Sequence, residues 1–258
     1  QSPLRRKRTG AIDLSATPFY LANSGYPEGS PFPWLVSDFG LVDAIESGIV
    51  KVPRLPVKDD IGAKDDAGRP DPKYFRLWAH IKESLNPNSD YVAKRPKPTA
   101  LYEHAQGALL TLTAQWKERF DKLRNESSDP DPIPPVMIIV CDSTDLSQVI
   151  FENISGEKEE EVLGEDGKIV KKKIFHGSQI NFPDLANSEG VQHTFRIDSK
   201  LLAKIETDGE VTKDEAANEL RELIASVGKR GGKGEQVRCV VSVSMLTEGW
   251  DASNVTHV

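Results

Sequence analysis

Cysteine is scarce in this chain, with only Cys141 and Cys239 among 258 residues. Two cysteines cannot provide a disulfide framework, and each lies inside an apolar run, which is typical of buried reduced thiols. The sequence has no Cys-x-x-Cys motif, and its five histidines lack metal-ligand spacing. This argues against a zinc site. No signal peptide is recognisable, so we expect a reducing, cytoplasmic location.

Long apolar runs and an excess of positive charge are also absent. No stretch of 18 apolar residues occurs, so the sequence predicts no membrane span. The 33 Lys and Arg against 40 Asp and Glu give a net charge of −7. This balance excludes a uniformly basic coat for nucleic acid, although a local basic groove stays open.

The second half of the sequence alternates between helical and strand patterns. Val136–Cys141 is continuously apolar, as strands buried in parallel sheets are, and residues 237–243 repeat the pattern. From residue 99 the predicted order is helix, strand, helix, hairpin, strand, helix, helix, strand, over residues 99–126, 136–141, 144–154, 157–175, 192–197, 199–206, 212–227 and 237–243. This alternation predicts an α/β layer sandwich with a mainly parallel sheet.

The first hundred residues are less regular. We expect a short strand at 11–14, a helix from Phe39 to Glu46 capped by Ser37 and Asp38, and a strand at 49–52. Residues 53–98 contain seven prolines and are predicted to hold one helix, near 73–85. Such a segment is typical of a connection between domains.

Three polar turns follow predicted strands, at the edge where open α/β sheets bind ligands. They are Ser15-Ala16-Thr17, Asp142-Ser143-Thr144 and Thr247-Glu248-Gly249-Trp250-Asp251. Each turn taken alone is more often a local cap. Together they offer phosphate and ribose contacts, because a glycine lets the backbone approach a phosphate while hydroxyl and carboxylate groups form hydrogen bonds.

The segments Leu14–Pro18 and Met245–Asp251 resemble motifs III and V of superfamily two helicases and translocases. Those motors hold ATP between two RecA-like domains, and nucleic acid crosses both. Residues 17–20, 32–48 and 195–202 resemble more narrowly the Res subunit of type III restriction enzymes. The resemblance implies that residues 1–57 end a first RecA-like domain, that 58–98 connect, and that 99–258 form most of a second one with an insertion at 157–190.

The resemblance also implies roles for individual residues. Ser15, Ala16 and Thr17 would couple nucleotide state to the nucleic-acid track, and Gly249 and Asp251 would contact the nucleotide. Contacts to nucleic acid would come from Asp142, Ser143 and Thr144, at the motif IV position, and from Thr247 and Glu248. Many superfamily members carry Arg where Glu248 stands.

The hydrolytic parts of such a motor are absent from these residues. The sequence has no Gly-x-x-x-x-Gly-Lys phosphate loop, no Asp-Glu-Ala-His magnesium box and no arginine-bearing motif VI. We therefore expect an internal piece of a longer DNA translocase with no complete catalytic set, which does not hydrolyse ATP alone. ATP and Mg²⁺ would bind mainly elsewhere in the parent protein, whose partners would be DNA and a methyltransferase subunit.

Several alternatives stay open at this point. The parent could be a DNA or RNA helicase without a nuclease, a non-catalytic scaffold, or, less plausibly, a phosphoacceptor domain using Asp142. A nuclease centre at Pro130-Asp131 with Asp166-Gly167-Lys168 fits poorly, since the second segment is typical of a hairpin turn. Trp250 could stack on a base or close the sheet edge. The basic runs 5–8, 171–173 and 229–233 could contact phosphate or simply face solvent.

Overall fold

The protein is described here by a computed structural model. It describes residues 19–20, 22–33, 35, 39–52, 54, 68, 76–163, 169–177, 181–197, 222–243 and 252–258. These residues fall into two compact units that divide between residues 55 and 56. Each unit is taken by itself below. The expected strand at 11–14 and the helix at 199–206 lie outside the described residues, as does most of the helix at 212–227, of which residues 222–226 are helical.

The first unit contains one short helix and an aromatic turn. Tyr20 stacks on Tyr26 with ring centroids 4.2 Å apart. Helix α1, Leu41–Glu46, begins at the N-cap Gly40, whose N–H donates to the Asp43 carboxylate over 2.8 Å. The expected start at Phe39 was therefore two residues early, and the proposed caps Ser37 and Asp38 lie outside the described residues.

The strand expected at residues 49–52 is wrong. The backbone N–H groups of Ile49 and Val50 both donate to the Ala44 carbonyl, at 2.9 and 3.1 Å, and so close the C-terminal end of α1. With these two amides bonded within the turn, residues 49–52 form no strand in the described part of the chain, and Ile49 is 72% exposed. Its β-branched residues suggested a strand, but the turn after the helix decided the backbone conformation.

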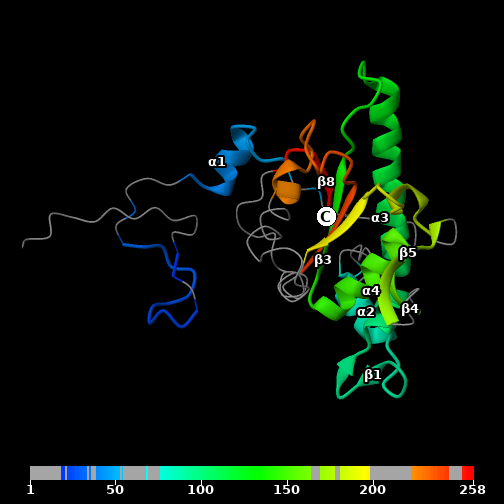
Figure 1. Ribbon diagram of the computed structural model, residues 1–258. Coiled ribbons are helices and arrows are strands. Elements are labelled where there is room, and N and C mark those ends of the chain that lie inside the picture. Colours follow the sequence, from blue (N-terminus) through cyan, green and yellow to red (C-terminus); the bar gives the residue numbers. More distant parts are fainter. Residues whose placement is uncertain are drawn as a thin grey trace, which may run out of the picture. The chain divides into compact units, whose positions relative to one another are not determined.

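The second unit is built around a four-stranded, fully parallel sheet in the order β6-β7-β3-β8 (Figure 1). The strands are β3 (Val136–Cys141), β6 (Thr194–Ile197), β7 (Cys239–Val243) and β8 (Val255–His257). The strands expected at 136–141, 192–197 and 237–243 are all found, the last two starting two residues later. The fold class of this unit is therefore α/β with a parallel sheet, as predicted.

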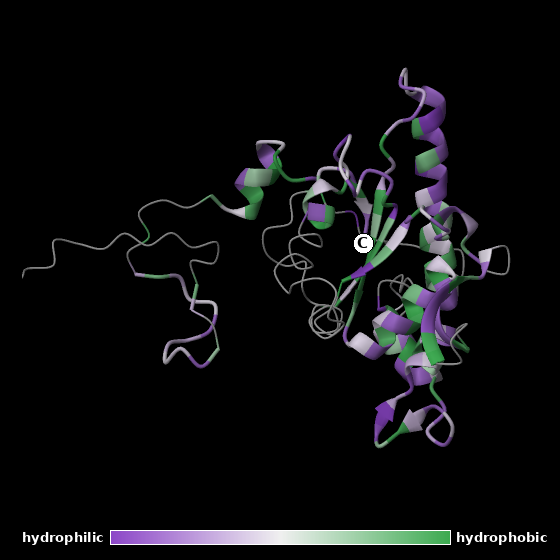
Figure 2. Ribbon diagram, in the orientation of Figure 1, coloured by the Kyte–Doolittle hydropathy of each residue, from purple (hydrophilic) through white to green (hydrophobic). Residues whose placement is uncertain are grey.

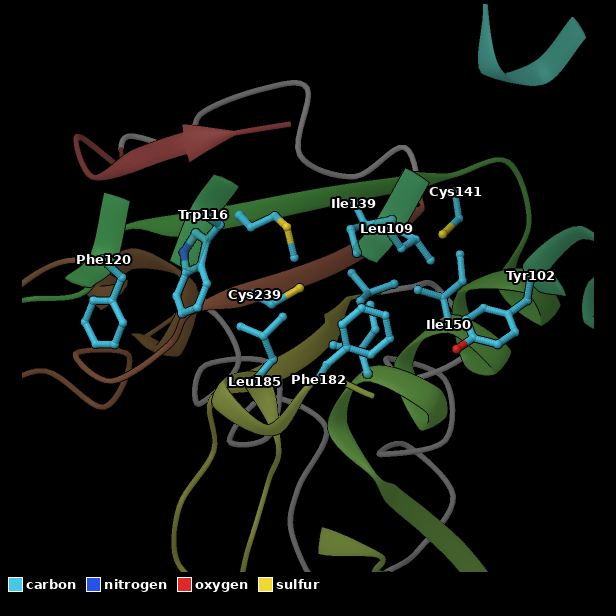
Figure 3. Close-up of a cluster of buried hydrophobic side chains, with 13 residues drawn as sticks. Tyr102, Leu109, Trp116, Phe120, Ile139, Cys141, Ile150, Phe182, Leu185 and Cys239 are labelled. Atoms are coloured by element: carbon cyan, nitrogen blue, oxygen red, sulfur yellow. The ribbon is translucent and has the colours of Figure 1, made fainter. Parts of the chain in front are cut away.

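Side chains alternate between the two faces of this sheet, and each face carries an apolar cluster. The odd-numbered residues of β3 join α3 and α4 in one apolar cluster (Figure 3). The even-numbered residues Val136 and Ile138 pack with Val227 and Val237 in a second cluster. Figure 2 shows the apolar strands of the sheet beside helices that carry polar outer faces.

Helix α3, Pro98–Glu126, runs beside the sheet, and its apolar residues recur at helical spacing as predicted. Trp116 is fully buried, and its indole N–H donates to the Pro135 carbonyl over 2.7 Å. Its ring stacks on Phe120 with centroids 5.2 Å apart, and the Arg238 guanidinium lies 5.0 Å from the Phe120 centroid. These contacts attach the last turns of α3 to the loop before β3 and to the start of β7.

The region before α3 contains helix α2, Leu77–Ser84, which confirms the helix expected near 73–85; residues 73–75 lie outside the described part. Two short antiparallel strands, β1 (Tyr91–Val92) and β2 (Arg95–Pro96), follow it and were not expected. Leu85 and Leu101 bury their side chains together in a small cluster of their own.

Helix α4, Thr144–Ser155, leads through Gly156 into an antiparallel hairpin of β4 (Glu157–Leu163) and β5 (Ile169–Phe175). The expected hairpin is therefore present, and its first strand begins at Glu157 directly after the helix. A short 3-10 helix η2, Pro183–Leu185, connects the hairpin region to β6.

Candidate functional site at the carboxyl edge of the sheet

The carboxyl ends of β3 and β7 meet at one edge of the parallel sheet. Cys141, the last residue of β3, is in register with Val243, the last residue of β7. The chain after Cys141 is the turn Asp142-Ser143-Thr144, and the chain after Val243 leads to Thr247–Asp251. In the sequence, two of the three predicted polar segments therefore follow adjacent strands of this sheet.

The first of these segments is an ordinary helix start. Ser143 is the N-cap of α4, and its hydroxyl accepts a hydrogen bond of 3.4 Å from the Leu146 N–H. The Ser147 hydroxyl donates to the Thr144 carbonyl over 2.8 Å. Asp142 is exposed. The predicted cap is confirmed, and within this turn the Asp142 carboxylate is the exposed polar group at the edge.

The other predicted site residues lie outside the described part of the chain. Ser15, Ala16 and Thr17 belong to residues 1–18, and Thr247, Glu248, Gly249 and Asp251 to residues 244–251, together with Trp250. Among the site residues of the sequence analysis, the structure therefore places Asp142, Ser143 and Thr144.

Two features of this edge were missed in the sequence. Val140 lies in the middle of the sheet, yet it is 60% exposed, so β3 is not buried along its whole length as expected. Its register partner on β7 is Ser242, which is fully buried and whose hydroxyl has no hydrogen-bond partner in the described part of the chain. A continuous apolar run does not indicate which of its residues other elements will pack against. The sequence pattern therefore could not predict that Val140 is exposed or that the Ser242 hydroxyl is buried without a partner.

The thiol beside this edge is not a nucleophile. Burial, and then the Asp142 charge, raise the pKa of the Cys141 thiol to about 12. Burial likewise raises the pKa of Cys239 well above its usual value. Because the reactive species is the thiolate, both groups stay protonated and inert near neutral pH.

Several basic residues proposed as phosphate contacts lie beside acidic residues of the same chain. Across the hairpin, Lys171, Lys172 and Lys173 lie opposite Glu161, Glu160 and Glu159, and the Lys173 ammonium lies 2.7 Å from the Glu157 carboxylate. In the loop after residue 228, Arg230 bonds to Asp129 and Lys233 lies 3.3 Å from Glu222. These pairs favour the structural interpretation of both basic runs. The run at 5–8 lies outside the described residues.

The proposed nuclease pair is only half described. Asp131 is exposed, and its carbonyl accepts from Arg230 over 3.0 Å, while Asp166-Gly167-Lys168 lie outside the described residues. In the described part of the chain, no three His, Cys, Asp or Glu side chains cluster as a metal site would require. None of the described helices is both long and apolar enough to cross a bilayer.

Comparisons with known proteins name no relative. No protein-family model matches the chain, and neither the curated proteins nor the solved structures contain a match. The fold defines the class as an α/β unit with a parallel sheet, and the turn Asp142-Ser143-Thr144 follows β3 at its carboxyl edge.

Proposed function

We propose that this chain is part of the motor of an ATP-dependent DNA translocase, of the kind found in type III restriction systems. The observation that carries the proposal is the register of Cys141 with Val243. In sequence, Val243 leads on to Thr247–Asp251, and the neighbouring strand β3 leads on to the exposed Asp142. Open parallel sheets bind nucleotides at this edge, beyond the ends of adjacent strands.

In this proposal the unit that contains the parallel sheet belongs to a second RecA-like domain, and residues 1–57 belong to the end of a first one. Gly249 and Asp251 would contact the nucleotide, while Thr247 and the Asp142-Ser143-Thr144 turn would face the nucleic acid. Ser15, Ala16 and Thr17 would transmit closure of the two domains to that track. A phosphate loop, an arginine finger and most Mg²⁺ ligands would be supplied by sequence beyond these 258 residues.

The test is nucleotide turnover in the longer protein that contains a phosphate loop. Replacing Asp251 by Ala should lower DNA-stimulated ATP hydrolysis by about tenfold or more, the size of effect expected from losing a charged hydrogen bond. The matched control is Asp121→Ala, which removes a half-buried carboxylate on α3 whose ion-pair partner in the described part of the chain is Lys117. Turnover in the control should equal that of the parent.

Two results would contradict the proposal. Unchanged ATP turnover in Asp251→Ala would show that Asp251 does not contact the nucleotide. ATP hydrolysis by the 258-residue chain alone would show that these residues do contain a complete catalytic set. A parent that binds DNA but never hydrolyses ATP would instead be the non-catalytic scaffold.

A further inference from the structure

The short hairpin of β1 and β2 carries two basic side chains at its tip. Lys94 lies in the turn, Arg95 begins β2, and both are exposed. Among the described residues, neither side chain has an ion pair or a hydrogen bond. The β4–β5 hairpin differs, because its Lys173 lies 2.7 Å from Glu157 and its other two lysines of residues 171–173 lie opposite glutamates. The β1–β2 tip is therefore a local positive charge in a chain of net charge −7.

The turn that holds Lys94 has an uncommon backbone conformation. Ala93 and Lys94 have φ of +50° and +66°, the sign that a type I′ turn requires at both central residues. Glycine and asparagine are the usual residues in such turns, because a Cβ atom makes positive φ costly. Backbone strain of this kind is concentrated at functional positions. The tip thus retains a lysine where glycine would fold more easily.

The base of this hairpin is fixed on the side of the sheet at which β3 ends. Tyr91, the first residue of β1, packs against the apolar cluster of Leu85 and Leu101. Leu146, in the first turn of α4, packs against the same cluster. Figure 1 shows the hairpin projecting from the end of the unit at which α2 and α4 lie. The basic tip therefore belongs to the same side of the unit as the exposed Asp142, which precedes α4.

The tip offers positive charge without an aromatic surface. Residues 92–97 contain no aromatic side chain, and Tyr91 is packed in the cluster at the base. Proteins that hold single-stranded nucleic acid stack its bases on aromatic rings. A duplex instead presents regular rows of phosphates, which Lys and Arg neutralise. Two unpaired cations with no aromatic ring beside them fit the backbone of a duplex and not unpaired bases.

We propose that the tip of the β1–β2 hairpin binds the phosphate backbone of duplex DNA through Lys94 and Arg95, without reading its sequence. The inference rests on the proposed function, in which the turn Asp142-Ser143-Thr144 on the same side of the unit faces the nucleic acid. The hairpin would extend that track by two phosphate contacts beyond the edge of the sheet.

The experiment measures how salt weakens DNA binding by the intact 258-residue chain. A labelled duplex of about 30 base pairs is titrated by fluorescence anisotropy at salt concentrations between about 50 and 200 mM, where each phosphate contact contributes about 0.9 to the slope of log K against log salt. Lys94→Gln/Arg95→Gln should lower this slope by about 2, equally for two duplexes of unrelated sequence. The matched control is Lys171→Gln/Lys172→Gln, which removes two lysines that lie opposite glutamates, and its slope should equal that of the parent.

A tethered probe tests the same contact without removing either cation. Cys141 and Cys239 are both buried, so an iron chelate attached to Ala93→Cys modifies the tip alone. It should cleave the bound duplex with ascorbate and peroxide. The same chelate on Asn125→Cys, about 40 Å away near the other end of α3, should cleave it weakly. Equal cleavage from both positions would contradict the contact.

Four further outcomes would overturn the proposal. They are an unchanged salt slope in the folded Lys94→Gln/Arg95→Gln variant, no binding of DNA by the unaltered chain, tighter binding to the single strand than to the duplex, and competition by poly-glutamate as effective as that by DNA of equal charge. None of these outcomes changes the result expected for Asp251→Ala. ATP turnover in the longer protein therefore separates a failure of this inference from a failure of the proposed function.

Discussion

The Asn187 side chain is buried and uses its full hydrogen-bonding capacity. Its amide N–H groups donate to Glu157 over 2.9 Å and to the Thr194 carbonyl over 2.8 Å. Its oxygen accepts from the backbone N–H groups of His193 and Thr194, at 3.0 and 2.9 Å. One side chain thus joins the hairpin base to the first residue of β6.

Replacing Asn187 by Ala should therefore be costly. The change removes one hydrogen bond from the buried Glu157 carboxylate, which keeps its ion pair with Lys173, and it removes the Asn187 partners of the His193 and Thr194 backbone groups, so we expect a loss of about 2–4 kcal/mol in the free energy of unfolding. Urea denaturation measures it. Asn125→Ala, at an exposed position on α3, should change stability by less than about 0.5 kcal/mol. Equal losses in the two variants would show that the network contributes nothing.

The buried thiols predict a dependence of stability on pH. Burial raises the pKa of Cys141 to about 12 from an ordinary value of 9.0, so the folded state prefers the neutral thiol. The contribution of this neutral thiol to the free energy of unfolding is complete below pH 9 and is lost as the pH rises toward 12. Urea midpoints measured across this window should fall less steeply in Cys141→Ala/Cys239→Ala than in the parent.

A thiol reagent at pH 8 should label neither cysteine until denaturant is added, and rapid labelling of the folded chain would contradict this burial.

At the scale of elements, the segment that precedes β8 is held by close packing against a glycine. The Asn254 side-chain amide donates to the Pro134 carbonyl over 2.8 Å, and the Asn254 backbone carbonyl accepts from the Val136 N–H over 2.9 Å. Gly228 has φ of +76°, and a Cβ atom there would lie 2.2 Å from the Asn254 side-chain oxygen. A larger residue at 228 therefore has to displace the residue that connects β8 to β3.

Gly228→Ala should cost more than backbone strain alone. Gly231 has the same φ of +76° but nothing within 4 Å of its Cβ position, so Gly231→Ala isolates the conformational term. We expect a loss of about 1 kcal/mol for Gly231→Ala and about 3 kcal/mol for Gly228→Ala. Hydrogen exchange should show faster opening of residues 255–257 in the second variant only. Equal costs would mean that Asn254 moves aside freely.

The elements found from sequence are those with strong local signals. Val136–Cys141 was predicted with its bounds, because a continuous apolar run bounded by prolines and a Ser cap leaves little freedom. Helix α3 was predicted within one residue at its start, because its apolar residues recur along one face. The strand at 49–52 failed because hydrogen bonding to Ala44, which no propensity encodes, uses its amides.

The candidate sites differ in the same way. The Asp142 turn could be found from its position after a strand. A pocket that Lys158 and Glu152 help to line could not, because these residues come from a helix and a hairpin and meet only through packing. Residues 157–161 are all charged, which suggests a solvated strand, and no spacing distinguishes the lysine that lines a pocket from those that face solvent.

At the scale of the whole molecule, the two units differ in how much apolar surface they bury. The described part of the first unit buries Ala44, while Phe39, Leu41 and Val42 are each at least 60% exposed. The second unit has a parallel sheet with an apolar cluster on each face and a fully buried Trp116. Folding requires buried apolar area to offset chain entropy, so stability should reside in the second unit.

Residues 56–258 expressed alone should therefore fold as cooperatively as the 258-residue chain. Trp116 reports this, because its indole is fully buried and hydrogen-bonded to Pro135, so unfolding shifts its emission to longer wavelength. Replacing Trp78, Trp34 and Trp250 by Phe leaves Trp116 as the single reporter. The urea midpoint of the shorter chain should lie within experimental error of the longer one, since residues 1–55 form a separate unit. A markedly lower midpoint would mean that the first unit stabilises the sheet, and the division between residues 55 and 56 would then not be a boundary of independent folding.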